Sequence, residues 1–182
     1  PNLLAGLMPH LDRDEPEIYI WMFYNAWCAC YREEVNAMVE HPMPWLGYSN
    51  RVVFKPSDEA NACSWLRTMF VYTRGNLLHF GRAIPRAWFA QPGPFEIQGT
   101  ATPFGPVGVK YTANERGDAL TANVALRMRD APGKILVRFR HSANAPIQSV
   151  TVNGQPHSAF DAARGDVDIT GMTGELEVVA KY

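Results

Sequence analysis

The chain has 182 residues, of which 47% are hydrophobic and 19% are charged, and its formal net charge is −1. This apolar content can form a core and excludes a disordered chain, while the near-zero net charge excludes a strongly basic surface for nucleic acid or an anionic membrane. No apolar stretch reaches the roughly eighteen residues of a transmembrane helix. From the charge and from this lack of a span, we expect neither a nucleic-acid nor a membrane partner.

Tryptophan and cysteine divide the chain into two different halves. All five Trp and all three Cys lie before residue 93. We therefore expect one domain over residues 1–92 and a second over residues 93–182. Three cysteines cannot form a disulfide framework, and no second ligand pair accompanies Cys28 and Cys30. We expect these side chains to be buried as small hydrophobes, and we expect no metal and no cofactor.

The first predicted element is a long helix over residues 14–39. Asp14 is a candidate N-cap, and Pro16 suits the first turn of the helix. The helix is apolar almost all round, which is typical of a helix buried on several sides. We expect Trp21, Phe23 or Trp27 to pack against another chain or to stay exposed.

A second helix is predicted over residues 58–74, with Ser57 as its cap and Gly75 at its end. The aromatic connector that follows contains Trp88 and Phe89, which we expect to be buried. From residue 94 to 182, apolar residues alternate with polar ones in seven or eight short runs separated by turn signals.

This alternation predicts an antiparallel β-sandwich, and the Asn153-Gly154 pair predicts a tight hairpin within it. The predicted fold class is therefore α+β, with helices followed by the sandwich. The sandwich half contains no Trp and few aromatic residues outside the alternating positions, so we expect it to act as a brace and not as a sugar-binding module.

Three stretches resemble the C-terminal end of a bacterial six-hairpin, (α/α)6-barrel glycoside hydrolase. They are the end of the aromatic helix at residues 37–42, the Lys-Pro-Ser-Asp-Glu-Ala run at 55–60, and the connector Leu-Leu-His-Phe-Gly-Arg-Ala-Ile-Pro-Arg-Ala-Trp-Phe at 77–89. The resemblance implies that residues 1–92 are the last helices of an α/α barrel, followed by a C-terminal β-sandwich.

In such barrels two carboxylates hydrolyse the glycosidic bond, and the general base lies in a loop before the last barrel helix. The resemblance places Glu40 in this role. The general acid would lie before Pro1, as would any targeting signal, so we expect the chain by itself to be catalytically inactive and assign no compartment. The expected partners are a carbohydrate substrate and the rest of the barrel, or another chain.

The site residues have competing structural explanations. Glu40 could be a solvated carboxylate at a helix end, although the helix dipole disfavours an acid there. Glu59, with its neighbour Asp58, is the second candidate base, but acids in a first helical turn are ordinary dipole partners. The candidate substrate-binding residues are His41, Trp45, Tyr48 and Asn50, which lie in the loop and not on a periodic face. His79 and Arg82 are expected to tie the connector to the sandwich.

Two other classes of function stay open. A barrel of the same shape can perform lyase or phosphorylase chemistry, and Arg51 and Lys55 in the loop suit the anion site of a phosphorylase. The chain could also be a non-catalytic carbohydrate-binding or interaction module. The sequence upstream of Pro1 would discriminate between these readings, because a barrel enzyme requires further helices and a second carboxylate there.

Overall fold

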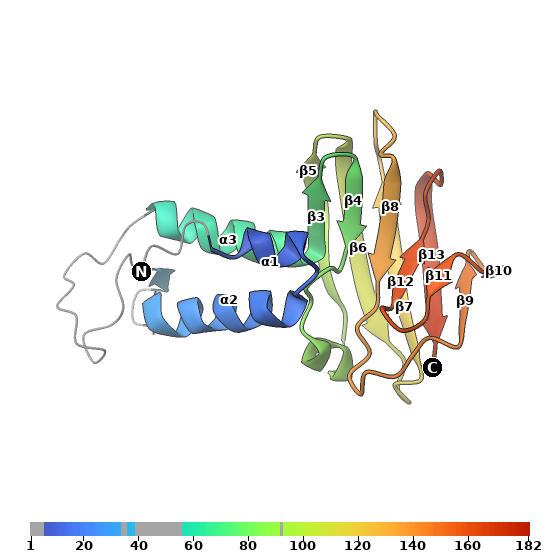
Figure 1. Ribbon diagram of the computed structural model, residues 1–182, viewed down its shortest axis with the longest axis horizontal. Helices are drawn as coiled ribbons and strands as arrows, with labels where there is room; N and C mark the ends of the chain where they lie inside the picture. The colour runs from blue at the N-terminus through green and yellow to red at the C-terminus, as the bar shows by residue number, and fades with distance from the viewer. Residues whose placement is uncertain (1–5, 34–35, 39–55, 92) are drawn as a thin grey trace. The chain divides into compact units, whose positions relative to one another are not determined.

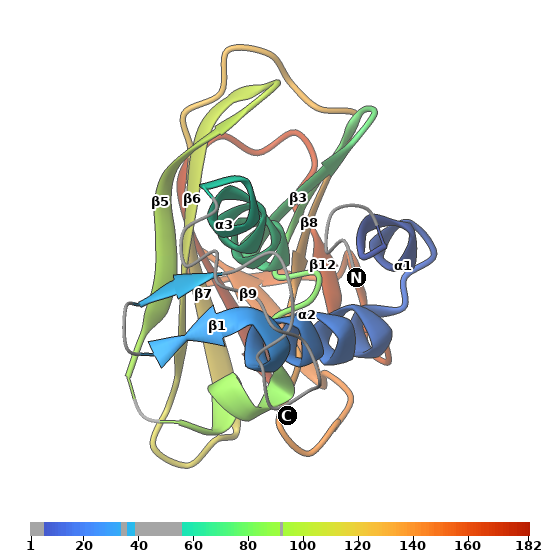
Figure 2. The same ribbon diagram turned by 90° about the vertical axis from the view of Figure 1, so that its left-hand side faces the viewer.

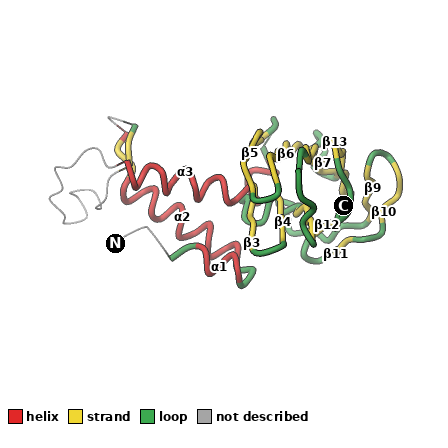
Figure 3. Tube along the Cα trace, turned by 90° about the horizontal axis from the view of Figure 1, so that it is seen from above, coloured by secondary structure: helices red, strands yellow, loops and turns green. Residues whose placement is uncertain are grey.

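The computed structural model of the protein describes residues 6–33, 36–38, 56–91 and 93–182. Helices come first in these residues and two larger sheets follow, which confirms the predicted α+β class (Figures 1 and 3). The chain divides into two compact units, Pro1–Thr68 and Met69–Tyr182. None of the helices in these described ranges has the length and apolar character needed to span a membrane.

The first unit is helical. Its elements are α1 (Met8–Asp12), α2 (Pro16–Cys30), β1 (Tyr31–Arg32), β2 (Ala37–Met38) and the larger part of α3 (Pro56–Phe70). The helix α2 begins at Pro16. Proline has no backbone N–H, and at the first position of a helix that group would have no partner within the helix. Asp14 is not its N-cap, because Asp14 has a φ of 61° and lies in the turn before the helix. Glu15 instead bonds to Arg13 and His10 and fixes this turn.

The helix α2 ends at Cys30, earlier than the predicted residue 39. Tyr31 adopts an extended conformation and pairs with Met38 across the β1–β2 hairpin. Asn36, with a φ of 50°, permits the turn and accepts a hydrogen bond from the Tyr31 hydroxyl at 2.7 Å. The strand pairing and this hydrogen bond hold residues 31–38 in a hairpin in place of a longer helix.

The helices α2 and α3 contact each other. The Tyr19 hydroxyl donates to the backbone carbonyl of Trp65 at 2.9 Å. At the other end of α2, Cys30 packs in a buried cluster with Met38 and Ala62. The expectation of a small buried cysteine is confirmed for Cys30, whereas Cys28 and Cys63 are exposed.

The helix α3 ends at Phe70 and not at residue 74. The next residues form β3 (Val71–Arg74), which pairs with β4 (Leu77–Phe80). Val71, Tyr72 and Thr73 are residue types that favour strands. Gly75, with a φ of 54°, serves the hairpin turn and not a helix cap. The strands therefore begin well before residue 93, and the two compact units divide earlier than the predicted boundary after residue 92.

The second unit contains two sheets that form the layers of a sandwich (Figure 2). The six-stranded sheet has the order β10-β9-β13-β7-β6-β5, and the five-stranded sheet has the order β11-β12-β8-β4-β3. The strands after β4 are β5 (Phe95–Thr102), β6 (Gly105–Ala113), β7 (Ala119–Leu126), β8 (Lys134–Arg138), β9 (Ser149–Val152), β10 (Gln155–His157), β11 (Phe160–Asp161), β12 (Asp166–Asp168) and β13 (Gly174–Lys181).

Alternation along these strands supplies the core, as predicted. In β7, for example, Leu120, Ala122, Val124 and Leu126 are buried while the residues between them are more exposed. The Asn153-Gly154 turn joins β9 to β10, and both of its residues have positive φ, as a type I′ hairpin requires. One pairing departs from the antiparallel pattern, because β4 runs parallel to β8.

The connector forms a short 3-10 helix, η3 (Arg86–Ala90). Phe89 is buried, as predicted, and packs edge-to-face on Phe95 and Tyr111. Trp88 is only half-buried, contrary to the prediction, although its ring contacts Phe70 and Phe95.

Candidate functional site

Most of the predicted site residues fall in a part of the chain that the structure does not describe. Outside the described residues lie Glu40, His41, Trp45, Tyr48 and Asn50. Glu59 lies in the first turns of α3 and is half-buried. The structure therefore places none of the loop residues relative to Glu59, and the assignment of a base to Glu40 or Glu59 stays a prediction.

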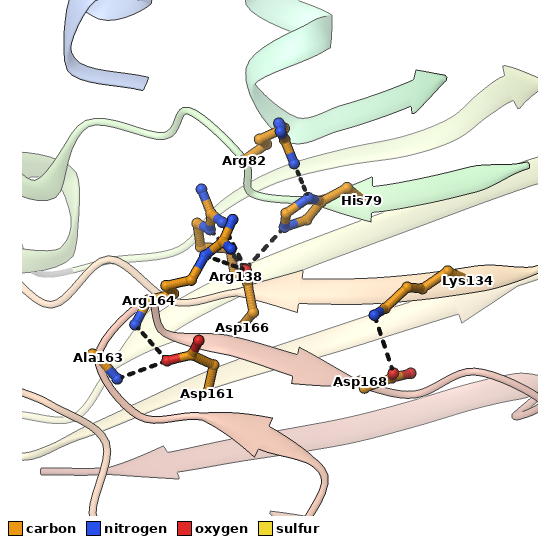
Figure 4. Close-up of polar contacts among 9 residues, drawn as sticks. All are labelled: His79, Arg82, Lys134, Arg138, Asp161, Ala163, Arg164, Asp166 and Asp168. Carbon is orange, nitrogen blue, oxygen red and sulfur yellow. Dashed lines mark hydrogen bonds and ion pairs between the residues drawn. The ribbon is translucent and has the colours of Figure 1, made fainter. Parts of the chain in front are cut away.

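A buried group of charged side chains, absent from the predicted site, lies in the five-stranded sheet (Figure 4). Strand pairing brings it together. Asp166 on β12 lies directly opposite Arg138 on β8, and His79 on β4 lies opposite Leu136 of β8. Val137 and Val167, the neighbours of Arg138 and Asp166, alternate to the other face and are buried in the apolar core.

Asp166 is the centre of this buried charge cluster, which consists of His79, Arg82, Arg138 and Asp166. Arg138 binds it with two parallel bonds, from Nε to Oδ1 at 2.6 Å and from Nη2 to Oδ2 at 2.7 Å. His79 Nε2 lies 3.0 Å from the same Oδ1, and Arg164 Nε forms a longer ion pair with Oδ2 at 3.6 Å. A bidentate arginine–carboxylate pair of this kind is among the strongest side-chain interactions.

The hydrogen bonds fix the tautomer of His79. Arg82 Nη1 lies 2.8 Å from His79 Nδ1, and a guanidinium group can only donate. Nδ1 must therefore be the unprotonated acceptor, so the proton of the neutral ring is on Nε2 and points at Asp166. Arg82 also lies over the ring of Tyr72, with Cζ 4.8 Å from the ring centroid.

The protonation states follow from burial and from these bonds. Burial lowers the pKa of His79 to about 4, despite the neighbouring carboxylate, so the ring is neutral near pH 7. Burial alone would raise the pKa of Asp166, but hydrogen bonds from Arg138 and His79 hold it well below its usual range. Asp166 is therefore an ionised carboxylate under all ordinary conditions.

This arrangement does not suit acid–base catalysis. A general base needs a free lone pair, and that of His79 already accepts from Arg82. A general acid needs a proton to donate, and Asp166 is ionised and saturated with donors. The buried charge cluster is therefore a structural connection between β4, β8, β12 and the chain that leaves β4, which confirms the expected role of His79 and Arg82 in tying the connector to the sandwich.

The rim of this cluster opens into a hollow of about 330 Å³ on the five-stranded sheet. Its charged side chains already have partners. Lys134 Nζ lies 3.9 Å from Asp168, Arg164 faces Asp166, and Asp161 accepts from the amides of residues 163 and 164. In the residues that the structure describes, no group of three or more potential ligands is arranged to hold a metal ion.

The helical unit contains a different candidate surface, on α2. Tyr19, Phe23, Ala26 and Cys30 form its buried stripe. On the opposite side, Ile18 is 42% exposed, Trp21 69% and Tyr24 41%. Glu17 is the only charged residue in the whole of α2. A helix whose solvent side carries aromatic residues and one charge is typical of a helix that packs against further protein on both sides.

Comparisons with known proteins give little further information. No family model matches the chain, and no curated protein matches it. Among solved structures, the chain is similar to one described as "Glycoside hydrolase", with 14% sequence identity and a TM-score of 0.44. The similarity covers 92% of this chain and 29% of that chain, so the present chain spans less than a third of that chain's length.

The sequence did carry a signal for part of the buried charge cluster. Arg138 and Arg140 flank Phe139 directly after the apolar run of β8, where a strand end next to solvent is the ordinary interpretation. Both arginines are buried, and Arg140 Nη1 donates to the carbonyl of Ile84 at 2.7 Å. Asp166 follows Arg164 and Gly165, a run typical of a turn, and no local pattern distinguishes a turn aspartate from one that a distant arginine will bury.

Proposed function

We propose that this chain forms the terminal part of a carbohydrate-active enzyme that hydrolyses glycosidic bonds. In this proposal the helical unit completes an α/α barrel, its loop supplies the general base, and the sandwich braces the barrel. The proposal combines the resemblance of residues 37–42, 55–60 and 77–89 to the end of a six-hairpin glycoside hydrolase with the character of α2.

The observation that carries the proposal is the exposed apolar side of α2. Trp21, Ile18 and Tyr24 together offer an exposed apolar surface, and Glu17 is the one charged residue of the helix. Exposed patches of this kind mark contacts with further protein. In an α/α barrel each helix packs on neighbours at both sides, so the missing neighbour is the preceding helix of the barrel.

The lack of exposed aromatic side chains on the described sandwich strands supports a bracing role for this unit. Among the described residues, every exposed large hydrophobic side chain lies before Val71, and the sandwich strands expose none. An aromatic platform for a polysaccharide requires such exposed rings. The buried charge cluster and the apolar layers give the second unit the rigidity that a brace requires.

The test is hydrolysis by the full-length protein that carries this chain, on a panel of soluble polysaccharides and aryl glycosides. Glu40→Gln keeps the size of the side chain and removes its basicity. It should therefore lower the rate of turnover at least about a hundredfold while substrate binding persists. Glu59→Gln is the matched control and should change only a helix-dipole interaction of about 0.5 kcal/mol.

Three outcomes bear on the assignment. Loss of turnover in Glu40→Gln alone supports it. Loss in Glu59→Gln alone transfers the role of the base to Glu59. If neither variant affects hydrolysis, or if the full-length protein hydrolyses no glycoside, the proposed function is wrong.

A further inference from the structure

A hollow at the other sheet of the second unit is separate from the buried charge cluster. It has a volume of about 450 Å³, within the range of small-molecule sites, and lies at one end of the six-stranded sheet. Three segments far apart in the sequence surround it. They are η3 with Gln91, the turn between β6 and β7, and Ser142 after β8.

The β6–β7 turn is a rigid rim. The Asn114 side chain accepts a bond from the Ala119 amide at 3.1 Å and donates to Asp118 at 2.6 Å. The Gly117 amide donates to the Asn114 carbonyl at 3.0 Å, and the positive φ of Gly117 closes the turn. The turn that carries Glu115 and Arg116 is thus held by hydrogen bonds between the residues before and after them.

His141 joins this rim to the facing one. Its Nδ1 accepts bonds from the amides of Ala143 and Ala145, so the ring proton is on Nε2, which donates to the Gly117 carbonyl at 3.0 Å. The ring of Tyr182 stacks on His141 with a centroid distance of 4.3 Å. Arg86 Nη1 donates to the His141 carbonyl at 3.1 Å, which connects η3 to the same residue. The hollow is therefore held open by Asn114, which lines it, and by the contacts of His141, which does not.

Apart from Asn114, whose side chain holds the turn, the polar side chains that line the hollow are free to bind. In the part of the chain that the structure describes, four polar side chains at its edge make no hydrogen bond or ion pair; they are those of Gln91, Glu115, Arg116 and Ser142. The hollow on the five-stranded sheet differs, because its charged side chains already have partners: two ion pairs join four of them, and Asp161 accepts from backbone amides.

The chemistry of these groups selects a class of ligand. One carboxylate and one guanidinium cancel in charge, so the hollow does not favour an anion or a cation. A carboxylate accepts hydrogen bonds, a guanidinium donates them, and an amide and a hydroxyl do both. Phe89, Ala90 and Ala113 add an apolar wall. A neutral molecule with adjacent hydroxyl groups fits these mixed donors and acceptors, and its C–H face fits the apolar wall.

We infer that this hollow, framed by η3, the β6–β7 turn and Ser142, binds a single neutral sugar unit, such as the end of an oligosaccharide. Arg116 and Glu115 bind its hydroxyl groups from one rim, and Gln91 and Ser142 bind from the other. The inference goes beyond the bracing role of the sandwich, and it relies on the proposed function only for the choice of sugars as the ligand. It differs from an aromatic platform because hydrogen bonds, and not ring stacking, provide the recognition.

The test is an NMR titration of the ¹⁵N-labelled chain with maltotriose, cellotriose, xylotriose and mannotriose. At least one sugar should give saturable shifts, with a Kd in the millimolar range, that map to residues 89–91, 113–117 and 141–143. The double variant Glu115→Gln and Arg116→Ala should weaken binding by about tenfold, since two charged hydrogen-bonding groups are lost.

The matched control is Arg127→Ala with Glu175→Gln, which removes an exposed ion pair at the opposite end of β7 and should leave binding unchanged. The inference is overturned if none of the four sugars gives saturable shifts, if the shifts map elsewhere, or if the two double variants behave alike. Hydrolysis of a small aryl glycoside by the full-length protein should be the same in both double variants, so failure of the inference is distinct from failure of the proposed function.

Discussion

Asp166 illustrates how a single residue can connect several strands. It receives two bonds from Arg138 and one from His79, and all three side chains are buried. A buried charge is tolerated only when it is paired and hydrogen-bonded, and removal of one partner leaves the other charge without compensation. The cluster is therefore more sensitive to loss of one member than its small size suggests.

Asp166→Asn should lower the free energy of unfolding by about 3–5 kcal/mol, because the guanidinium of Arg138 is then left buried without a counter-charge. Urea denaturation followed by fluorescence measures this change. Asp130→Asn is the control, because Asp130 is exposed, and it should stay within about 0.5 kcal/mol of the wild type. Equal effects of the two substitutions would contradict the role of the cluster.

The lowered pKa of His79 predicts how stability depends on pH. In the unfolded chain this ring takes a proton near pH 6.5, while in the folded protein it stays neutral down to about pH 4. Between these values the unfolded state binds more protons, so the free energy of unfolding falls as the pH falls. Asp166, whose pKa is also lowered on folding, loses its contribution at still lower pH.

His79→Gln removes the titrating group and should flatten the pH dependence of the free energy of unfolding between pH 6.5 and 4. Urea titrations at several pH values measure the slope. A variant that keeps the full wild-type slope in this window would show that another group is responsible.

At the residue scale, the sequence analysis expected His79 and Arg82 to tie the connector to the sandwich, and both take part in the cluster. Arg138 and Asp166 were missed, because their pairing depends on the register of β8 against β12. Register is a long-range property, and the turn residues around Asp166 indicated only a loop.

At the scale of elements, two glycines of the β3–β4 region perform different tasks. Gly75 and Gly81 both have positive φ, at 54° and 71°. A Cβ on Gly75 would meet nothing within 4 Å. A Cβ on Gly81 would overlap the Tyr111 hydroxyl and approach the Arg138 carbonyl to 2.6 Å. Only the second glycine is needed for packing as well as for backbone conformation.

Gly75→Ala should therefore cost about 1 kcal/mol of stability from the left-handed backbone alone. Gly81→Ala adds an overpacking cost of about 1–3 kcal/mol, because Tyr111 and the β8 backbone must move. Comparison of the urea midpoints of the two variants separates these effects. Equal midpoints would contradict the close approach at Gly81.

The connector provides a second element-scale prediction. Phe89 is buried between Phe95 and Tyr111, while Trp88 is half-buried. Phe89→Ala should lower the free energy of unfolding by about 3–5 kcal/mol, and Trp88→Ala by clearly less, because a partly solvated ring leaves a smaller cavity. A larger loss in Trp88→Ala, in the same urea experiment, would contradict the observed packing.

The type of each main element could be predicted from the sequence better than the residues at which it begins and ends. Alternation correctly predicted the sandwich strands, and the Asn153-Gly154 turn was correctly placed. The long helices were correctly located, but both were predicted too long, since β1 and β3 follow them without a Gly or Pro to mark the boundary. In α2 nearly every side is apolar, so the pattern could not show that Tyr19 would be buried and Ile18 exposed.

At the scale of the whole molecule, the exposed apolar side of α2 is the feature on which the proposed function depends. Its outward side keeps Trp21 at 69% exposure, as the sequence predicted for a helix that is apolar all round. The proposal that the chain completes a barrel requires this side to be covered in the full-length protein. The same substitution should therefore have different effects in the two contexts.

Trp21→Lys is the direct measurement, with the midpoint of urea unfolding compared between this chain and the full-length protein. In this chain the change should stay within about 0.5 kcal/mol, because Trp21 is exposed and Lys can pair with Glu17 one turn earlier. In the full-length protein it should cost about 3 kcal/mol or more, because an unpaired charge is buried. Phe23→Ala, on the buried stripe, should destabilise both by about 3–5 kcal/mol. If Trp21→Lys is harmless in the full-length protein, the exposed side of α2 has no partner there and the barrel proposal is contradicted.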